Sequence, residues 1–190
     1  MIFISFLTGI NSMMRGPYGF LLIVVLLFPI MGSTLLQMTV EQDEKSEFDR
    51  IQLTYPLSKR EIVLSKYLGG LLVQGGMILY SFLFLLVYVY GYKTLTFGEA
   101  ISTWGIGVAG SLVYFSVSYM VYFWLGNMKG VIFTFITMAV LVIGFVFSVG
   151  LEELMQVDKS IWVLCLWGMA AVFIALSYWI SVKIYAKKHS

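Results

Sequence analysis

Five long stretches of this chain carry no charged side chain, and they constrain its fold more than any other feature. Each stretch is long enough to cross about 30 Å of hydrocarbon as an α-helix, which takes roughly 20 residues. Helices are the expected form because every backbone polar group must be satisfied inside the segment, and no alternating barrel pattern is present. The uncharged stretches are residues 16–40, 67–92, 100–128, 130–151 and 160–182.

The composition excludes a water-soluble fold. Of 190 residues, 60% are hydrophobic and only 12% are charged, whereas ordinary soluble domains carry roughly 25% charge. A soluble chain of this size still exposes roughly 30% of its unfolded surface, so lipid must be part of its solvent. The single cysteine, Cys165, excludes an internal disulfide, and the single histidine, His189, leaves no metal cluster or histidine-based catalytic set.

The distribution of Lys and Arg predicts the orientation. Cytoplasmic loops of membrane proteins carry an excess of these residues. If residues 41–66 are cytoplasmic, that side of the membrane holds nine basic residues against three, and the C-terminus lies inside the cell. The nine are Lys45, Arg50, Lys59, Arg60, Lys66, Lys129, Lys183, Lys187 and Lys188, and the three are Arg15, Lys93 and Lys159.

The first ten residues, MIFISFLTGI, are apolar but too short to span. Ten helical residues reach about 15 Å, half of a bilayer. We interpret residues 1–15 as the outer part of a first span, otherwise missing, followed by an external loop; a short re-entrant or interfacial segment is the alternative. The expected fold is thus an all-α integral membrane protein, a single domain over 1–190 with five full transmembrane helices and a partial N-terminal segment.

The cores of the five spans contain no Asp, Glu, Lys, Arg or His. Charges inside a membrane usually mark ion paths or proton relays, so their absence argues against an ion-coupled transporter. It also argues against an intramembrane hydrolase, because Glu152-Glu153 are better explained as part of a solvated external turn. We therefore expect no enzyme, no metal site, and a source of energy outside this chain.

Residues 41–66, called here the coupling segment, hold six of the ten acidic and five of the twelve basic residues. The first half is a candidate amphipathic cytoplasmic helix, which Pro56 ends because proline cannot donate to the helix ladder and biases Tyr55 away from helical geometry. One face of this helix follows helical spacing. The residues on that face are Val40, Glu44, Phe48, Ile51 and Tyr55, while most of the charged side chains lie elsewhere.

A second helix is predicted to begin directly after this corner. The pattern Ser58-Lys59-Arg60-Glu61 is a capping box, in which Ser58 caps the amide of Glu61 and Glu61 reaches back to the amide of Ser58. Leu57 and the residue after Glu61 are placed as a hydrophobic staple. Lys59 and Arg60 oppose the positive end of the helix dipole, a local conflict worth up to about 1 kcal/mol.

These residues resemble a family pattern. The sequences DEK at 43–45, FDR at 48–50 and LTYPLSKREIVLSKYL at 53–68 are similar to those of small bacterial permeases of the type-2 ATP-binding-cassette transporters. In that family a stretch like DEK…WDR…LPxSRxxIVxSKYL follows the second of six spans. Phe48 replaces the usual tryptophan, Lys59 stands in the usually basic pair, and most of the first span is missing here.

The resemblance implies the membrane-spanning permease subunit of an ATP-driven exporter in the bacterial plasma membrane. Two such subunits, identical or similar, would pair above two ABC ATPase subunits, which bind the ATP. The permease itself has no phosphate-binding loop. The residues expected to couple it to the ATPase are Asp43, Glu44, Phe48, Asp49, Arg50, Tyr55, Pro56, Leu57, Ser58, Lys59, Arg60 and Glu61.

The alternative is a non-transporting membrane anchor, an immunity or sensor subunit, that docks a cytosolic partner through the coupling segment. Nucleic-acid binding has no support, because the basic residues are mixed with acidic ones beside a membrane surface. The aromatic- and Met-rich spans favour apolar or amphipathic cargo for a transporter.

Overall fold

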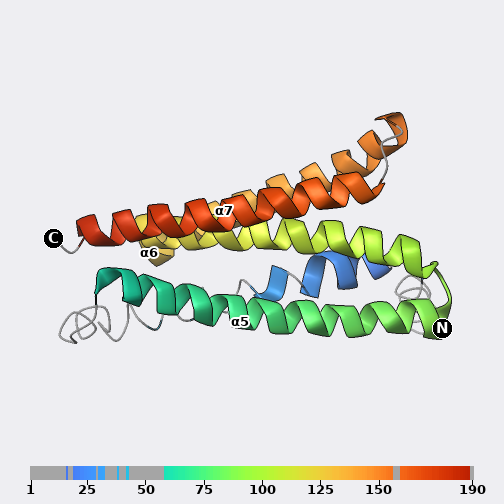
Figure 1. The fold of residues 1–190 in the computed structure, drawn as a ribbon, viewed down its shortest axis with the longest axis horizontal. Helices are drawn as coiled ribbons and strands as arrows, with labels where there is room; N and C mark the ends of the chain where they lie inside the picture. The colour runs from blue at the N-terminus through green and yellow to red at the C-terminus, as the bar shows by residue number, and fades with distance from the viewer. Residues whose placement is uncertain are drawn as a thin grey trace, which may run out of the picture.

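The computed structural model describes residues 16, 19–28, 30–32, 38, 42, 58–155 and 159–188, and all of its regular elements are helices (Figure 1). The prediction of an all-helical membrane fold is therefore confirmed for the described part of the chain. In chain order the elements are the π-helix η1 (Phe20–Leu27), α5 (Lys59–Leu86), the π-helix η2 (Val87–Tyr92), α6 (Phe97–Met155) and α7 (Lys159–Lys188).

α5 and η2 form one continuous rod from Lys59 to Tyr92, 34 residues in all. At 1.5 Å per residue this rod is about 50 Å long, well beyond the hydrocarbon thickness of about 30 Å. It ends where Lys93 adopts left-handed backbone angles (φ 52°), which turn the chain into the next helix. The capped start of the rod can therefore project from the membrane while its apolar part spans it.

α6 begins with a capping box of its own and breaks at a glycine. Thr96 and Glu99 exchange the bonds of this box, with Glu99 N donating to Thr96 Oγ1 over 3.4 Å and Thr96 N donating to Glu99 Oε2 over 3.2 Å. The break falls at Gly126, whose φ of 73° and ψ of −174° leave helical geometry. Splitting the chain at its charges placed the boundary between two spans at Lys129, three residues further on, whereas the backbone leaves helical geometry at Gly126, where the lack of a Cβ atom permits these angles.

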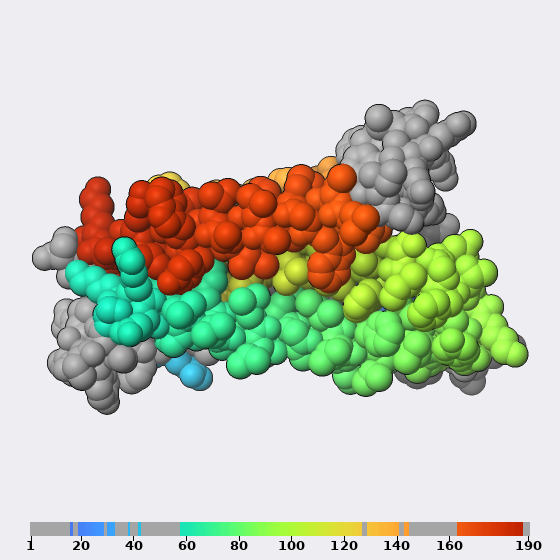
Figure 2. Space-filling view, in the orientation of Figure 1, coloured from blue at the N-terminus to red at the C-terminus, as the bar shows by residue number. Residues whose placement is uncertain are grey.

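The helix before Gly126 lies at the centre of the molecule. In the most apolar part of Phe97–Gly126, 61% of the residues are buried. The corresponding share is 17% for Lys59–Tyr92 and 11% for Val163–Lys187. Figure 2 shows α5 and α7 side by side over one face, with part of α6 visible between them. The capped start of α5 and the end of α7 lie at the same end of the bundle (Figure 1).

The buried apolar residues form two clusters toward opposite ends of α5. The tyrosine cluster joins α5, α6 and α7 near the capped end, and the distal cluster joins η1, α5, η2 and the start of α6. The tyrosine cluster consists of Ile62, Val63, Tyr67, Phe115, Tyr119, Tyr122 and Tyr185. The distal cluster consists of Phe20, Val24, Val25, Leu85, Tyr88 and Ala100.

Three helices are long and apolar enough to cross a membrane, namely Lys59–Tyr92, Phe97–Gly126 and Val163–Lys187, within the residues described. Two shorter apolar helices, Phe20–Gly32 and Lys129–Val140, overlap the predicted spans 16–40 and 130–151. The count of five full spans stays a prediction. The partial segment 1–15 lies outside the described residues.

Candidate coupling site

The structure describes four of the residues expected to couple the chain to a partner, and they stand together at the start of α5. Ser58 is the N-cap, and Lys59, Arg60 and Glu61 form the first turn. The remaining predicted residues lie outside the described part of the chain. These are Asp43, Glu44, Phe48, Asp49, Arg50, Tyr55, Pro56 and Leu57.

The predicted capping box is confirmed. Ser58 N donates to Glu61 Oε2 over 2.7 Å, and Glu61 N donates to Ser58 Oγ over 3.3 Å. The Ser58 hydroxyl also donates to Glu61 Oε2 over 2.8 Å. The backbone bond from Ser58, and then the bond from its hydroxyl, lower the pKa of the Glu61 carboxyl, because both favour the charged form. The helix start is thus fixed by its own side chains.

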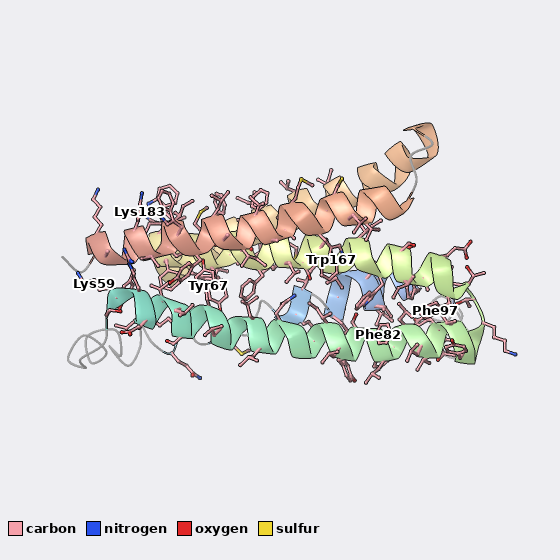
Figure 3. The ribbon with its side chains drawn as sticks, viewed as in Figure 1. Lys59, Tyr67, Phe82, Phe97, Trp167 and Lys183 are labelled. Atoms are coloured by element: carbon pink, nitrogen blue, oxygen red, sulfur yellow. The ribbon has the colours of Figure 1, made fainter. Side chains whose placement is uncertain are left out.

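Lys59 connects this start to the last turn of α7. Its ammonium group donates to the carbonyl oxygen of Ala186 over 3.4 Å (Figure 3). A cation at a helix C-terminus is favourable, because it meets the negative end of the dipole and an unsatisfied carbonyl. The conflict that Lys59 creates at the start of α5 is therefore offset by its contact with the end of α7, which the sequence alone did not indicate.

Tyr67 is the next connection along α5. Its hydroxyl lies 2.7 Å from Ser177 Oγ and 2.8 Å from Ser181 Oγ on α7, and all three side chains are buried (Figure 3). The Ser177 hydroxyl in turn donates to the backbone carbonyl of Ser116 on α6. We call this arrangement of Tyr67, Ser177, Ser181 and the Ser116 carbonyl the hydroxyl node.

A second tyrosine fastens α5 to α6 beside the node. Tyr119 Oη donates to the carbonyl oxygen of Lys66 over 3.0 Å. This approach requires a glycine on α5, because a Cβ atom at Gly70 would overlap the Tyr119 hydroxyl. Small residues commonly allow such close contact between membrane helices.

The node is one end of a polar seam along α5, formed by Tyr67, Gln74 and Ser81. Gln74 Nε2 donates to Ser111 Oγ over 3.1 Å, and Trp104 Nε1 donates to Ser81 Oγ over 2.6 Å. The step of seven residues from Gln74 to Ser81 is matched by a step of seven in the reverse direction along α6, from Ser111 to Trp104, as expected for antiparallel helices. The seven-residue spacing of polar residues within an apolar span is the sequence signal that could have identified this seam.

An apolar cavity of about 570 Å³ lies between the first described helix and α6. Its polar groups are the hydroxyls of Tyr114 and Thr134, and the Thr134 hydroxyl already donates to the carbonyl of Gly130 over 2.7 Å. Cavities of this size accommodate small organic ligands. The remaining lining residues are Leu22, Leu26, Leu27, Ile30, Met31, Val131, Phe135 and Met138.

Long apolar helices, joined by hydrogen bonds between buried side chains, are typical of a multi-pass membrane protein. The sequence profile described as "ABC-2 family transporter protein" matches residues 1–186, and the chain belongs to this family. No curated protein and no solved structure matches the chain. Membrane components of this family typically work with an ATPase partner, which agrees with the resemblance seen in the sequence.

Proposed function

We propose that this chain is the membrane-spanning subunit of an ATP-driven exporter, and that residues 41–66 receive the movement of a separate ABC ATPase. Family membership and the capped, well-defined start of α5 support this proposal. ATP would bind to the ATPase subunit, while this chain would supply the path through the membrane. A second copy, or a similar permease, would complete that path.

The observation that carries the proposal is that hydrogen bonds attach the start of α5 to both α6 and α7. Within the first turns of this helix, the chain holds its own cap and bonds to both neighbouring helices through Lys59, Lys66 and Tyr67. Packed helices move as rigid bodies in many switching proteins. A displacement applied at this end would therefore pass to α6 and α7 instead of bending α5 alone.

The shared location of the basic segments supports a cytoplasmic position for this end. The start of α5, the turn near Lys129 and the end of α7 were predicted on one side of the membrane from their Lys and Arg residues. Contacts between Lys59 and Ala186, and between Tyr122 and Gly130 beside the Gly126 turn, bring these segments to one end of the bundle. An ATPase in the cytosol would meet that end.

The cavity supports an apolar or amphipathic cargo. Its lining offers hydroxyls and hydrocarbon but no charged side chain, so a strongly hydrated solute would lose its water without compensation. Lipids, hydrophobic peptides and drug-like molecules fit this chemistry. Export of a strictly hydrophilic cargo would contradict this part of the proposal.

Co-purification tests the proposal. The full chain would be co-expressed with the ABC ATPase encoded nearest to it and isolated in mild detergent. We expect a stable complex, and we expect charge reversal at Glu44, Asp49 or Arg60 to uncouple ATP hydrolysis from transport without preventing membrane insertion. Lys93→Glu, at the opposite end of α5, is the matched control for Arg60→Glu. A partner bound equally with and without a functional ATPase would favour the anchor alternative.

A further inference from the structure

The hydroxyl node joins three helices through one chain of hydrogen bonds inside the membrane-spanning bundle. Tyr67 belongs to α5, Ser177 and Ser181 to α7, and the Ser116 carbonyl to α6. The node lies a few turns beyond the capped start of α5, between the coupling segment and the rest of the bundle. Any displacement entering along α5 therefore reaches this node before it reaches the remaining polar seam.

Counting the available hydrogens identifies the donor and the acceptor of each bond in the node. A carbonyl only accepts, so the single hydrogen of Ser177 is used on Ser116. Ser177 Oγ must then accept from Tyr67, which uses the phenolic hydrogen. The remaining contact is therefore donated by Ser181 to the oxygen of Tyr67. Each of the three hydroxyls donates one bond, and Tyr67 is the group that both donates and accepts between α5 and α7.

The ring of Tyr67 is held separately from its hydroxyl. Its centroid lies 4.5 Å from that of Tyr119 and 5.6 Å from that of Tyr178, and it stacks parallel to Phe123 at 6.3 Å. Phenylalanine would preserve these ring contacts while removing both hydrogen bonds. The node can thus be tested without opening a cavity in the tyrosine cluster.

We propose that Tyr67 is a positioning residue that locks α5, α7 and the Phe97–Gly126 part of α6 into one body, so that the three move together when the coupling segment is displaced. This inference rests on the proposed function, since it assigns the route by which the ATPase movement enters the bundle. Ser177 and Ser181 are one helical turn apart, so together they hold the Tyr67 hydroxyl against sliding of α7 along α5.

The test measures the distance between the two helices during the ATPase cycle. Spin labels at Leu64→Cys, an exposed position outside the predicted coupling residues, and Lys187→Cys, with Cys165→Ser, report the separation of the α5 start from the α7 end in nanodiscs containing the ATPase complex. We expect one narrow distance distribution with and without ATP in the otherwise native chain. Tyr67→Phe should broaden or split it when ATP is added, whereas Tyr90→Phe, an exposed tyrosine of the same rod, should not.

The results distinguish failure of this inference from failure of the proposed function. If the ATPase does not bind the native chain, the proposed function is wrong. If it binds and Tyr67→Phe keeps the native distribution, or if the native distance itself changes with ATP, Tyr67 does not lock the helices. Thermal stability of Tyr67→Phe in detergent, measured beside Tyr90→Phe, shows whether a broadened distribution merely reports unfolding.

Serine variants test the node from the other side. In Ser177→Ala the Tyr67 hydrogen can turn to Ser181, although the bond to the Ser116 carbonyl is lost, and in Ser181→Ala it still reaches Ser177. Each single change therefore keeps one bond between Tyr67 and α7. Losing an average bond of this kind shifts a membrane-helix equilibrium roughly threefold. We expect small broadening from either single variant and the full Tyr67→Phe effect from the double variant. Single variants as severe as Tyr67→Phe would contradict the shared role of the two serines.

Discussion

The two ends of α5 are held in different ways. At the capped end, the tyrosine cluster combines aromatic packing with directed bonds between Tyr67 and α7, and from Tyr119 of α6 to the Lys66 carbonyl of α5. At the far end, the distal cluster packs residues such as Val25 and Leu85 against Ala100 through apolar contacts. Directed bonds fix one geometry, whereas apolar surfaces in lipid tolerate small shifts because they gain little from one exact register.

This difference indicates which end is suited to receive a displacement and which end can adapt to it. The capped end has few alternative arrangements, since sliding α7 along α5 would break hydroxyl contacts in the node. The distal end also has a directed bond, from Trp104 to Ser81, but the contacts within its cluster are apolar and can adjust where no backbone approaches closely.

Gly107→Ala should be the most destabilising of the small changes. A Cβ atom there would lie 2.6 Å from the backbone oxygen of Val25, so the first helix itself must shift. Overpacking of this kind costs about 1–3 kcal/mol. Gly110→Ala is the control, because its Cβ would meet open space. Thermal unfolding in detergent should show a lower midpoint for Gly107→Ala alone, and equal midpoints would contradict the close packing.

Gly70→Ala should follow, acting at the capped end. The added methyl group would displace the Tyr119 hydroxyl and break its bond to the Lys66 carbonyl, with a cost of about 1–2 kcal/mol. The adjacent Gly69→Ala has room for its Cβ and should be neutral or slightly stabilising, because alanine favours helix. The comparison is made by the same unfolding assay. A greater loss in Gly69→Ala would contradict the assigned faces of α5.

Ser81→Ala tests the polar seam toward the far end of α5. It removes the acceptor of the Trp104 indole N–H, and bonds of this kind average about 0.6 kcal/mol in membrane bundles, with a maximum near 1.7 kcal/mol. Ser102→Ala is the control, since that exposed hydroxyl donates only to the Gly98 carbonyl of its own helix. Trp fluorescence should shift in Ser81→Ala because Trp104 changes its partner. An unchanged spectrum and stability would show that the bond is unimportant.

The capping box should give the smallest effect and a dependence on pH. Glu61 has a lowered pKa in the folded chain, so its contribution is present above the ordinary carboxyl range and is lost as the pH falls through the folded value. Between pH 8 and about 5 the helix start should be constant, and it should weaken below about pH 4. Hydrogen exchange of the amides near Arg60 measures this, and Glu61→Gln should remove the dependence.

Local patterns predicted more of this structure than contacts between helices did. The capped start at Ser58 followed from four consecutive residues, and the box at Thr96 and Glu99 has the same spacing but was overlooked beside a span boundary. The sequence places the boundary between two spans at Lys129, because charged residues mark the membrane edge. The helix breaks at Gly126, because backbone geometry decides where a helix stops.

Pairings between distant segments could not be predicted from single stretches. Lys59 donates to the Ala186 carbonyl, and Tyr67 bonds to two serines on α7, only because the fold brings α5 and α7 together. Sequence periodicity shows that positions such as Gln74 and Ser81 share a face, but it does not identify which helix lies opposite. The partners of that face require the folded arrangement.

Photocrosslinking between the permease and its ATPase tests the central claim most directly. A photoreactive phenylalanine derivative would be placed at Arg60, at the capped end, or at Lys93, at the opposite end of the rod. In the assembled complex we predict an ATPase adduct from position 60 and none from position 93. An adduct from position 93 alone would place the motor at the wrong end of α5 and contradict the account.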